Sequence, residues 1–154
     1  MKRLIVLVAT GFGLGYSPVA SGTVGSLLGV LIVLALAPLP LGIQIAVAAA
    51  LSLAAIPITD LAEKHFGKKD DGRIVADEYL TFPLCTLGLP WLSHPWLLAV
   101  AFVVNRVLDI VKPPPARQAQ ALRGGWGITV DDIVSSLYAL ALNHVIWLVV
   151  SRMM

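Results

Sequence analysis

Asn105, Asp109 and Lys112 interrupt the apolar run that precedes a triple proline in the second half of the chain. Their spacing places all three on one face of a helix. An isolated carboxylate among apolar side chains is costly unless a cation or a metal ion balances it. The stretch that follows, up to position 132, adds two arginines, a Gly-rich loop and a pair of aspartates. Carboxylates beside cations at the edge of an apolar segment indicate a site for a metal ion and a phosphate group.

Three acidic residues, the adjacent pair Asp77 and Glu78 and the single Asp109, adjoin apolar segments and have competing interpretations. Asp77 and Glu78 are candidate Mg²⁺ ligands, because hard cations take carboxylate oxygens. They are equally compatible with a solvated pair at a helix N-terminus, where the helix dipole favours negative charge. Asp109 lies about one turn inside an apolar helix, so a metal or phosphate role competes with a structural salt bridge to Arg106 or Lys112.

The remaining acidic pairs have stronger structural interpretations. Thr129-x-x-Asp132 has the spacing of a capping box directly before an apolar helix, and this predicts Thr129 as an N-cap. Asp131 is not needed for that cap, which favours it as a metal ligand. Asp70 and Asp71 occur in a Lys-Lys-Asp-Asp-Gly-Arg context that is typical of a turn.

Gly-rich segments and cations supply candidate phosphate-binding groups. Backbone N–H groups at the start of a helix bind anions, and residues 22–26 and 124–127 both qualify. Neither is a Walker A loop, which requires Gly-Lys-Ser/Thr. Thr23 is a plausible N-cap for the first of these helices. Lys112, Arg117 and Arg123 could clamp a phosphate or, alternatively, contact anionic lipid head groups.

Composition places the chain in a bilayer. It has 154 residues, enough for one domain over residues 1–154, and is 58% hydrophobic but only 13% charged. Its mean hydropathy of +0.86 is far above that of a soluble domain. The formal net charge of +2 and the absence of a basic, aromatic-interleaved patch argue against nucleic acid as a partner. The single Cys85 lies in an apolar run and is predicted to be a buried, inert thiol.

The hydrophobic pattern predicts an all-α, polytopic membrane helical bundle of about four or five apolar segments. Residues 4–10 are too short to span a membrane, and 79–92 carry two prolines and predict a short, broken segment or the first arm of a re-entrant hairpin. The triple proline at 113–115 must end the helix before it. The segments expected to form membrane helices are 24–37, 41–58, 96–111 and 133–150.

The distribution of charge predicts which side each segment faces. All nine acidic residues and eight of the eleven basic residues fall between positions 60 and 132. The chain turns at 38–42 and 93–95 carry no charge, whereas the N-terminus and the segments 59–78 and 105–132 carry lysine and arginine. Since basic residues mark the cytoplasmic side, both polar segments are expected there, with the candidate site between them and the membrane.

Taken together, the motifs of residues 11–135 resemble phosphatidylglycerophosphatase A, a bacterial family. Each motif is weak alone, but the ordered set is specific. The motifs are Ser17-Pro18 with Gly22-Thr23-x-Gly25-Ser26, Ile74-Val75-x-Asp77-Glu78, Arg106-x-Leu108-Asp109-x-x-Lys112-Pro113 with Pro115 and Arg117, Gly124-Gly125-x-Gly127-Ile128, and Asp131-Asp132-Ile133. The chain departs from the family pattern at Thr81, where a Gly is usual, and at Gln118–Gln120, which lacks an acidic residue.

The resemblance implies a multi-pass enzyme of the bacterial cytoplasmic (inner) membrane with its active site facing the cytoplasm. The family hydrolyses phosphatidylglycerophosphate to phosphatidylglycerol and inorganic phosphate and depends on Mg²⁺. Our hypothesis is metal-assisted hydrolysis in which carboxylates hold Mg²⁺ and cations neutralise the phosphoryl group. The expected metal ligands are Asp77, Glu78, Asp109, Asp131 and Asp132. The expected catalytic residues are Asp77, Asp109, Asp131, Arg106 and Lys112. The expected phosphate-binding residues are Gly22, Thr23, Gly25, Ser26 and Arg117.

Three alternatives stay open at this point. A covalent aspartyl-phosphate would replace direct attack by water. A small ion-coupled transporter would use Asp109 as an intramembrane binding charge, although the charges lie at one membrane face and no inverted repeat is evident. A CDP-alcohol phosphotransferase would need an Asp-Gly-x-x-Ala-Arg signature, and Asp71-Gly72-Arg73-Ile74 does not continue that way. Partners beyond the phospholipid substrate and membrane lipids, including the oligomeric state, are not determined by the sequence.

Overall fold

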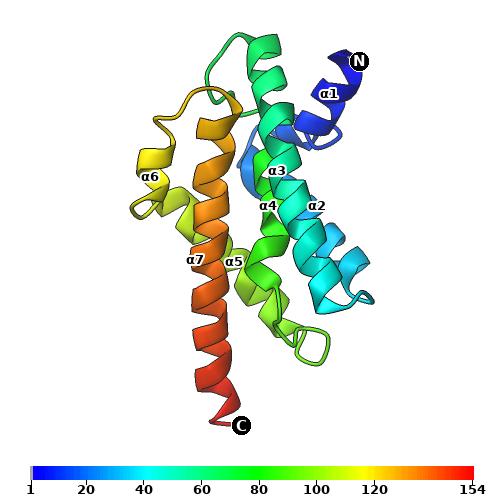
Figure 1. Cartoon of the computed structure of the whole chain (residues 1–154), viewed down its shortest axis with the longest axis vertical. Helices are drawn as coiled ribbons and strands as arrows, with labels where there is room; N and C mark the ends of the chain where they lie inside the picture. The colour runs from blue at the N-terminus through cyan, green and yellow to red at the C-terminus, as the bar shows by residue number, and fades with distance from the viewer. Residues whose placement is uncertain (1) are drawn as a thin grey trace.

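The computed structural model describes residues 2–154, which form helices joined by turns and contain no strand (Figure 1). The predicted all-α class is therefore confirmed. In chain order the elements are α1 (Lys2–Ala9), η1 (Leu14–Tyr16), α2 (Ser21–Leu36), α3 (Leu41–Phe66), α4 (Ala76–Thr81), η2 (Phe82–Thr86), α5 (Trp96–Val111), α6 (Ala116–Ala119) and α7 (Gly125–Ser151).

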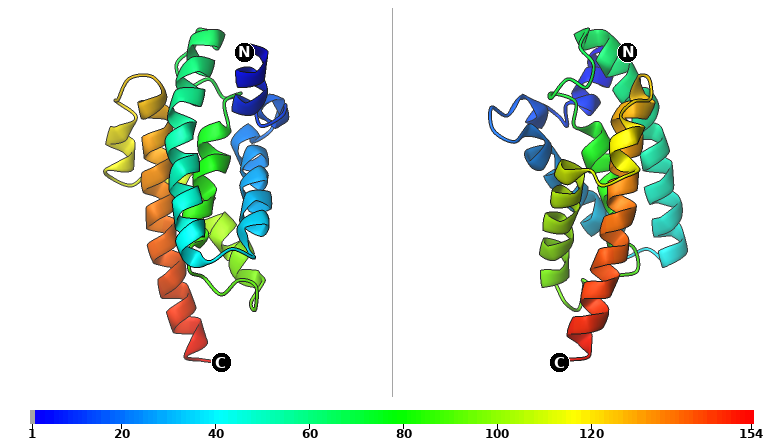
Figure 2. Two further views of the ribbon diagram at one scale, coloured as in Figure 1. Left: turned by 45° about the vertical axis from the view of Figure 1, so that its right-hand side comes forward. Right: turned by 90° about the vertical axis from the view of Figure 1, so that its left-hand side faces the viewer.

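Helices α3 and α7 are the long elements of the bundle, and they run side by side in both views of Figure 2. The backbones of the two helices approach each other closely at the start of α7. A Cβ on Gly125 would lie only 1.9 Å from the carbonyl oxygen of Ile56 in α3. The hydroxyls of Thr59 and Thr129 lie 3.1 Å apart beside it. Both helices are long and apolar enough to cross a membrane, with mean hydropathies of 2.1 and 1.9. Helices α2 and α5 are apolar but shorter, with 16 residues each.

The broken segment predicted at 79–92 is confirmed, and it lies inside the bundle. Its two pieces, α4 and η2, are almost wholly buried, and Phe82 is completely inaccessible. Helix α2 packs against it closely, since a Cβ on Gly29 would lie 2.5 Å from the Cβ of Phe82. Cys85 is also fully buried here, as predicted. Phe82 and Cys85 belong to the main hydrophobic core, together with Leu97 and Ala101 of α5 and Ala139 of α7.

Helix α5 ends where the triple proline requires. Its last residue is Val111, and Lys112 adopts a left-handed conformation with φ of 49° just before the prolines. Asn105 and Asp109 lie on the buried face of α5, with 3% and 7% of their surfaces exposed. The predicted stripe is therefore confirmed for Asn105 and Asp109, whereas Lys112 lies just beyond the end of the helix.

Two predicted N-caps are wrong. Helix α2 begins at Ser21, so Thr23 lies within its first turn and makes no capping hydrogen bond. Helix α7 begins at Gly125, which places Thr129 in its second turn, bonded to Thr59. The N–H group of Gly125 is instead capped by a carboxylate oxygen of Asp60, at 3.3 Å, from the neighbouring helix α3.

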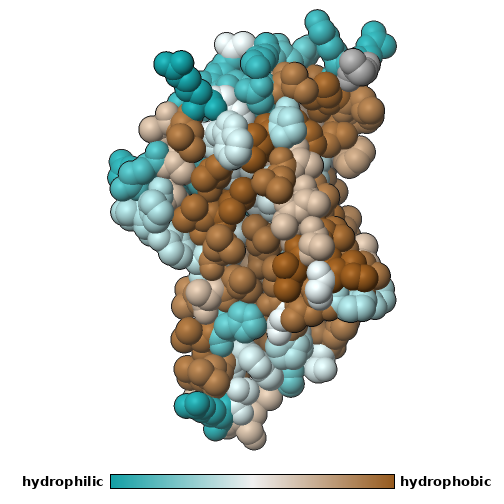
Figure 3. Space-filling model, viewed as in Figure 1, coloured by the Kyte–Doolittle hydropathy of each residue, from teal (hydrophilic) through white to brown (hydrophobic). Residues whose placement is uncertain are grey.

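The outer surface has a broad apolar belt. Figure 3 shows brown side chains across the middle of the molecule and hydrophilic side chains gathered at the upper end. Helices α2 and α5 contribute exposed apolar stripes at helical spacing. These stripes are Leu27, Leu31 and Leu34 on α2, and Val103, Val107 and Ile110 on α5. Large contiguous apolar surface of this kind is typical of a membrane-facing protein.

Candidate active site

The first element of the candidate site is α4, and the two buried residues that precede it, Ile74 and Val75, hold it in place. Ile74 and Val75 are buried, and the N–H of Val75 donates to the carbonyl of Ala9 at 2.9 Å. A Cβ on Gly25 would lie 2.6 Å from the Cβ of Val75, so α2 can approach this segment only because position 25 is glycine. The result is that Asp77 and Glu78, in the first turn of α4, point into the bundle.

Glu78 joins three helices through one carboxylate. It accepts hydrogen bonds from the Ser26 hydroxyl of α2 at 3.0 Å and from Arg106 of α5 at 2.8 Å. Arg106 also donates to the Ser26 hydroxyl at 3.1 Å. Only 12% of the Arg106 side chain and 15% of the Glu78 side chain are exposed, so this pair is shielded from solvent screening. A Cβ on Gly22 would lie 2.0 Å from a Glu78 oxygen, and so the site requires glycine there.

Asp109 lies between the two buried cations of the site. Its carboxylate is 3.0 Å from Arg106 and 3.6 Å from the Lys112 ammonium. Lys112 also contacts Asp131 of α7 directly. Partial burial opposes the charged form of this lysine, but the carboxylates of Asp132, Asp131 and Asp109 outweigh it and raise the pKa of Lys112. The structural salt bridge and the site role proposed for Asp109 are thus not exclusive.

The cluster holds more carboxylates than cations. Glu78, Asp109 and Asp131 form ion pairs with Arg106 or Lys112. Asp77 and Asp132 are buried carboxylates of the cluster that form no ion pair within the described residues 2–154. Four of these five carboxylates have a buried oxygen that accepts no hydrogen bond, namely Asp77 Oδ1, Asp109 Oδ1, Asp131 Oδ1 and Asp132 Oδ2. Of these, Asp109 Oδ1 lies 3.6 Å from the Lys112 ammonium, at the distance of an ion pair. Buried acceptors without partners cost free energy and call for an explanation in an ion or a ligand.

These oxygens fit a divalent cation by their chemistry. Hard cations such as Mg²⁺ are bound by carboxylate oxygens and water, which matches a donor set of aspartates and one glutamate. Within residues 2–154, however, no three acidic, histidine or cysteine side chains are arranged around one point as a completed metal site. The structure therefore shows the donors gathered from α4, α5 and α7, with unpaired oxygens.

The predicted phosphate-binding segment 22–26 lies beside these carboxylates. Ser26 faces Glu78 and Arg106, and Ser21 anchors the start of α2 by donating to the Gly72 carbonyl at 2.7 Å. Gly22 and Gly25 allow the close packing described above, and this gives each glycine a structural reason. A role of this segment in binding phosphate stays a prediction.

Arg117 is the predicted site residue that the structure leaves apart. It lies on the short helix α6, its side chain is exposed, and within residues 2–154 it makes no hydrogen bond or ion pair. Asp131 and Asp132, in contrast, are 1% and 4% exposed, in the second turn of α7. The capping-box interpretation of Asp132 is wrong, and both aspartates belong to the cluster.

One site-supporting residue was missed from the sequence. The hydroxyl of Ser136 donates to the side-chain oxygen of Asn105 at 3.1 Å, and both residues are buried. This bond fixes α5 against α7 one turn below Asp109 and Asp132. The signal was available, because Ser136 lies four residues after Asp132 and therefore on the same helix face.

Comparison with known proteins adds to this geometry. The family model of phosphatidylglycerophosphatase A matches residues 7–147. A putative phosphatidylinositol-3-phosphatase of Bacteroides thetaiotaomicron is 36% identical over 154 aligned positions, which cover 92% of this chain and 94% of the relative.

Two proteins named phosphatidylglycerophosphatase A are similarly related. That of Haemophilus influenzae is 35% identical over 138 positions, covering 88% of this chain and 84% of the relative. The protein of Escherichia coli is 33% identical over 141 positions, which cover 91% of this chain and 81% of the relative. No solved structure matches the chain significantly.

Proposed function

The chain belongs to the phosphatidylglycerophosphatase A family and is a phosphatase, and we propose that it hydrolyses phosphatidylglycerophosphate to phosphatidylglycerol and inorganic phosphate with the help of Mg²⁺. The observation that carries this proposal is the buried cluster of five carboxylates and two cations, in which four carboxylate oxygens accept no hydrogen bond. A fully satisfied salt-bridge network would need no ligand, whereas this one lacks positive charge.

The residues of the cluster divide into two roles. Asp77, Glu78, Asp109, Asp131 and Asp132 would hold Mg²⁺, which when bound orients a phosphate ester and an attacking water. Arg106 and Lys112 already lie against these carboxylates and would neutralise the charge that develops on the phosphoryl oxygens. Lys112 follows the left-handed end of α5, which turns its ammonium back toward α7.

The groups around the cluster would bind the rest of the phosphate. The start of α2, with Gly22, Thr23, Gly25 and Ser26, lies next to Glu78 and offers hydroxyls and backbone N–H groups. Arg117 is exposed on α6 and would act only at the rim, where long-range attraction guides a charged head group toward the site.

We further propose a multi-pass protein of the bacterial cytoplasmic membrane with this site at the cytoplasmic face. Supporting this, α1 and the last turns of α7 lie at opposite ends of the molecule in Figure 1, an arrangement that fits a count of five crossings. Helices α3 and α7 have the length to cross, while α2, α5 and the buried α4–η2 segment would complete a count of four or five. In Figure 1 the start of α7, whose second turn carries Asp131 and Asp132, lies at the same end of the molecule as the basic helix α1.

The test is phosphate release by the detergent-purified chain from two phosphomonoester lipids in parallel. We expect release from phosphatidylglycerophosphate that stops with a chelator and returns with Mg²⁺. Phosphatidylinositol 3-phosphate serves as the second substrate, because one relative carries that name. Faster release from the inositol lipid would move the substrate assignment to it. Release that is indifferent to chelation would overturn the metal role while leaving the phosphatase.

A further inference from the structure

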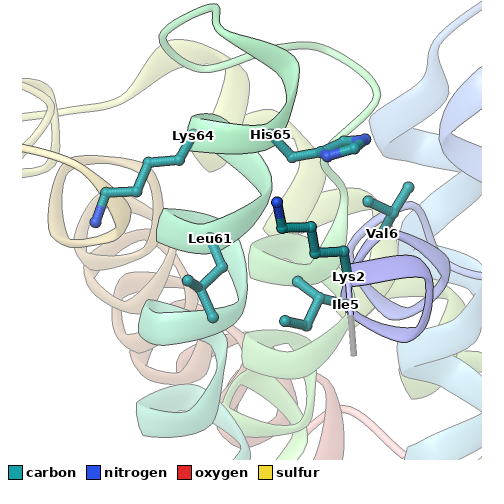
Figure 4. A pocket seen from close by; sticks show the side chains of 6 residues that line it. All are labelled: Lys2, Ile5, Val6, Leu61, Lys64 and His65. Atoms are coloured by element: carbon teal, nitrogen blue, oxygen red, sulfur yellow. The ribbon is translucent and has the colours of Figure 1, made fainter.

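A pocket of about 340 Å³ lies between α1 and the last turns of α3, outside the carboxylate cluster. Its walls are Lys2, Ile5 and Val6 of α1 and Leu61, Lys64 and His65 of α3 (Figure 4). None of these six residues contributes to the candidate active site. The pocket is therefore separate from the candidate active site.

The lower part of this pocket is apolar. Ile5, Val6 and Leu61 form it, and Leu61 is 45% exposed although it is a large hydrophobic residue. On the outer side of α1, Leu4 and Leu7 are exposed as well, at 64% and 45%. A basic start followed by apolar residues on an eight-residue helix is the pattern of a segment that lies in the membrane interface. Acyl chains would meet this face.

The upper rim of the pocket is cationic. Lys2 and His65 approach its opening from α1 and α3, and both can donate hydrogen bonds. Lys64 lines the wall with its methylene groups, but its ammonium turns away and binds Asp60 at 2.6 Å. The pocket thus combines an apolar base with one imidazole and one ammonium at its rim, and that ammonium forms no ion pair with any of the described residues 2–154.

We propose that this pocket binds the head group of an anionic phospholipid, with the lipid phosphate at Lys2 and His65 and the first part of an acyl chain on Ile5, Val6 and Leu61. Charge complementarity favours a lipid with a net negative head group over a zwitterionic one, and the apolar base selects a lipid over free phosphate. Anionic phospholipids are abundant in the cytoplasmic leaflet of a membrane.

The bound lipid would also stabilise the position of α4, which carries Asp77 and Glu78, through helix α1. Helix α1 ends on the segment that carries α4, through the bond from Val75 to the Ala9 carbonyl and another from the Tyr79 hydroxyl to the Val8 carbonyl, each 2.9 Å long. A lipid that ties α1 to α3 therefore steadies the support of α4. This pocket is a site for a resident lipid, and turnover takes place elsewhere.

Native mass spectrometry of the detergent-purified full chain tests the proposal without any catalytic step. The probes are dioleoylphosphatidylserine, dioleoylphosphatidylcholine and inorganic phosphate. We expect tighter retention of phosphatidylserine than of phosphatidylcholine, and about fivefold weaker retention in Lys2→Gln, from the loss of one charge near the surface. The matched control is Arg3→Gln, which removes the neighbouring charge of α1 but does not line the pocket.

A second pair of variants tests the apolar base. Leu61→Trp fills the pocket and should displace the lipid, whereas Leu53→Trp changes an exposed leucine of α3 outside the pocket and should not. Equal losses in Lys2→Gln and Arg3→Gln would reveal diffuse surface attraction and overturn the proposal. Equal retention of phosphatidylcholine would also overturn it, as would retention of inorganic phosphate that depends on Lys2 in the same way. Failure of these tests would leave the phosphatase proposal intact, because binding is measured without turnover.

Discussion

The acidic residues of this chain form two groups that differ in where their partners lie. In the first group, at the end of α3 and in the loop after it, partners are near in sequence. Lys64 donates to Asp60, the N–H of Asp70 donates to Glu63, and Arg73 holds Asp71. In the second group, the cluster of Asp77, Glu78, Asp109, Asp131 and Asp132, the carboxylates of Glu78 and Asp131 are bound by residues of other helices. Asp109 pairs along its own helix, with Arg106 and Lys112, and these two cations join it to Glu78 and Asp131.

This difference separates structural carboxylates from functional ones. Local pairs can form as soon as a turn or a helix forms, and their partners Lys64 and Arg73 are well exposed, although Asp71 itself is buried. The cluster gathers charge from three helices, buries it and leaves four oxygens unpaired. Stability alone favours replacing such a group with apolar side chains, so its retention indicates a ligand.

Asp109→Asn should produce the largest effect of any single change. The amide keeps the size of the side chain but removes the charge that lies between Arg106 and Lys112. We expect phosphate release from phosphatidylglycerophosphate to fall by about 10²–10³-fold or more. Asp71→Asn is the control from the first group and should retain the wild-type rate. Equal rates for the two variants would reduce Asp109 to a structural ion pair and erase the distinction between the groups.

Gly22→Ala should act through Glu78 alone. The added Cβ would lie 2.0 Å from a Glu78 oxygen, so the carboxylate must move away from Ser26 and Arg106. A displacement of about 1 Å in a catalytic group costs up to about 10²-fold in rate, and we expect a fall of about 10-fold to 10²-fold. Gly42→Ala on α3 is the matched control, because no atom lies within 4 Å of its added Cβ. A wild-type rate in Gly22→Ala would show that the position of Glu78 is immaterial.

Much of this arrangement was predictable because its causes are local. A triple proline stops a helix wherever it occurs, and α5 ends at Val111 as expected. The polar stripe of Asn105 and Asp109 follows from helix period alone, and so does its burial once the rest of α5 is apolar. The motif order then placed the carboxylates of the cluster in one site before any contact was known.

The parts that failed depend on contacts between distant segments. The N-terminus of α7 is capped by Asp60, 65 positions earlier, and no local pattern encodes such a cap. Thr129 therefore looked like an N-cap while it serves as a packing partner of Thr59. Arg117 shares a motif with Lys112, yet the turn and the short α6 carry it to the surface.

Asp60→Ala extends the comparison to a residue of the first group that also has a distant partner. The change removes the acceptor for the N–H of Gly125 at the start of α7. We expect a loss of about 1 kcal/mol in the free energy of unfolding in detergent, with phosphate release per folded molecule unchanged. Lys64→Gln is the control, since it removes only the exposed ion pair and should cost less than about 0.5 kcal/mol. A fall in rate without a loss of stability would move Asp60 into the site.

Asp71→Asn should have the smallest effect on phosphate release, and its effect on the free energy of unfolding should depend on pH. The Arg73 guanidinium holds the pKa of Asp71 at about 2, against an ordinary value of 3.8, and outweighs the opposing effect of burial. Because the folded state keeps this carboxylate ionised more readily than the unfolded state does, its contribution to stability is complete above about pH 4 and disappears as the pH falls through 2. The difference in free energy of unfolding between wild type and variant should therefore be constant from pH 7 to pH 5 and should shrink below pH 4. In an Arg73→Gln background the same change should have almost no effect, since the partner is gone. A difference that persists unchanged to pH 2 would mean that Asp71 stabilises the loop through the shape of its turn rather than its charge.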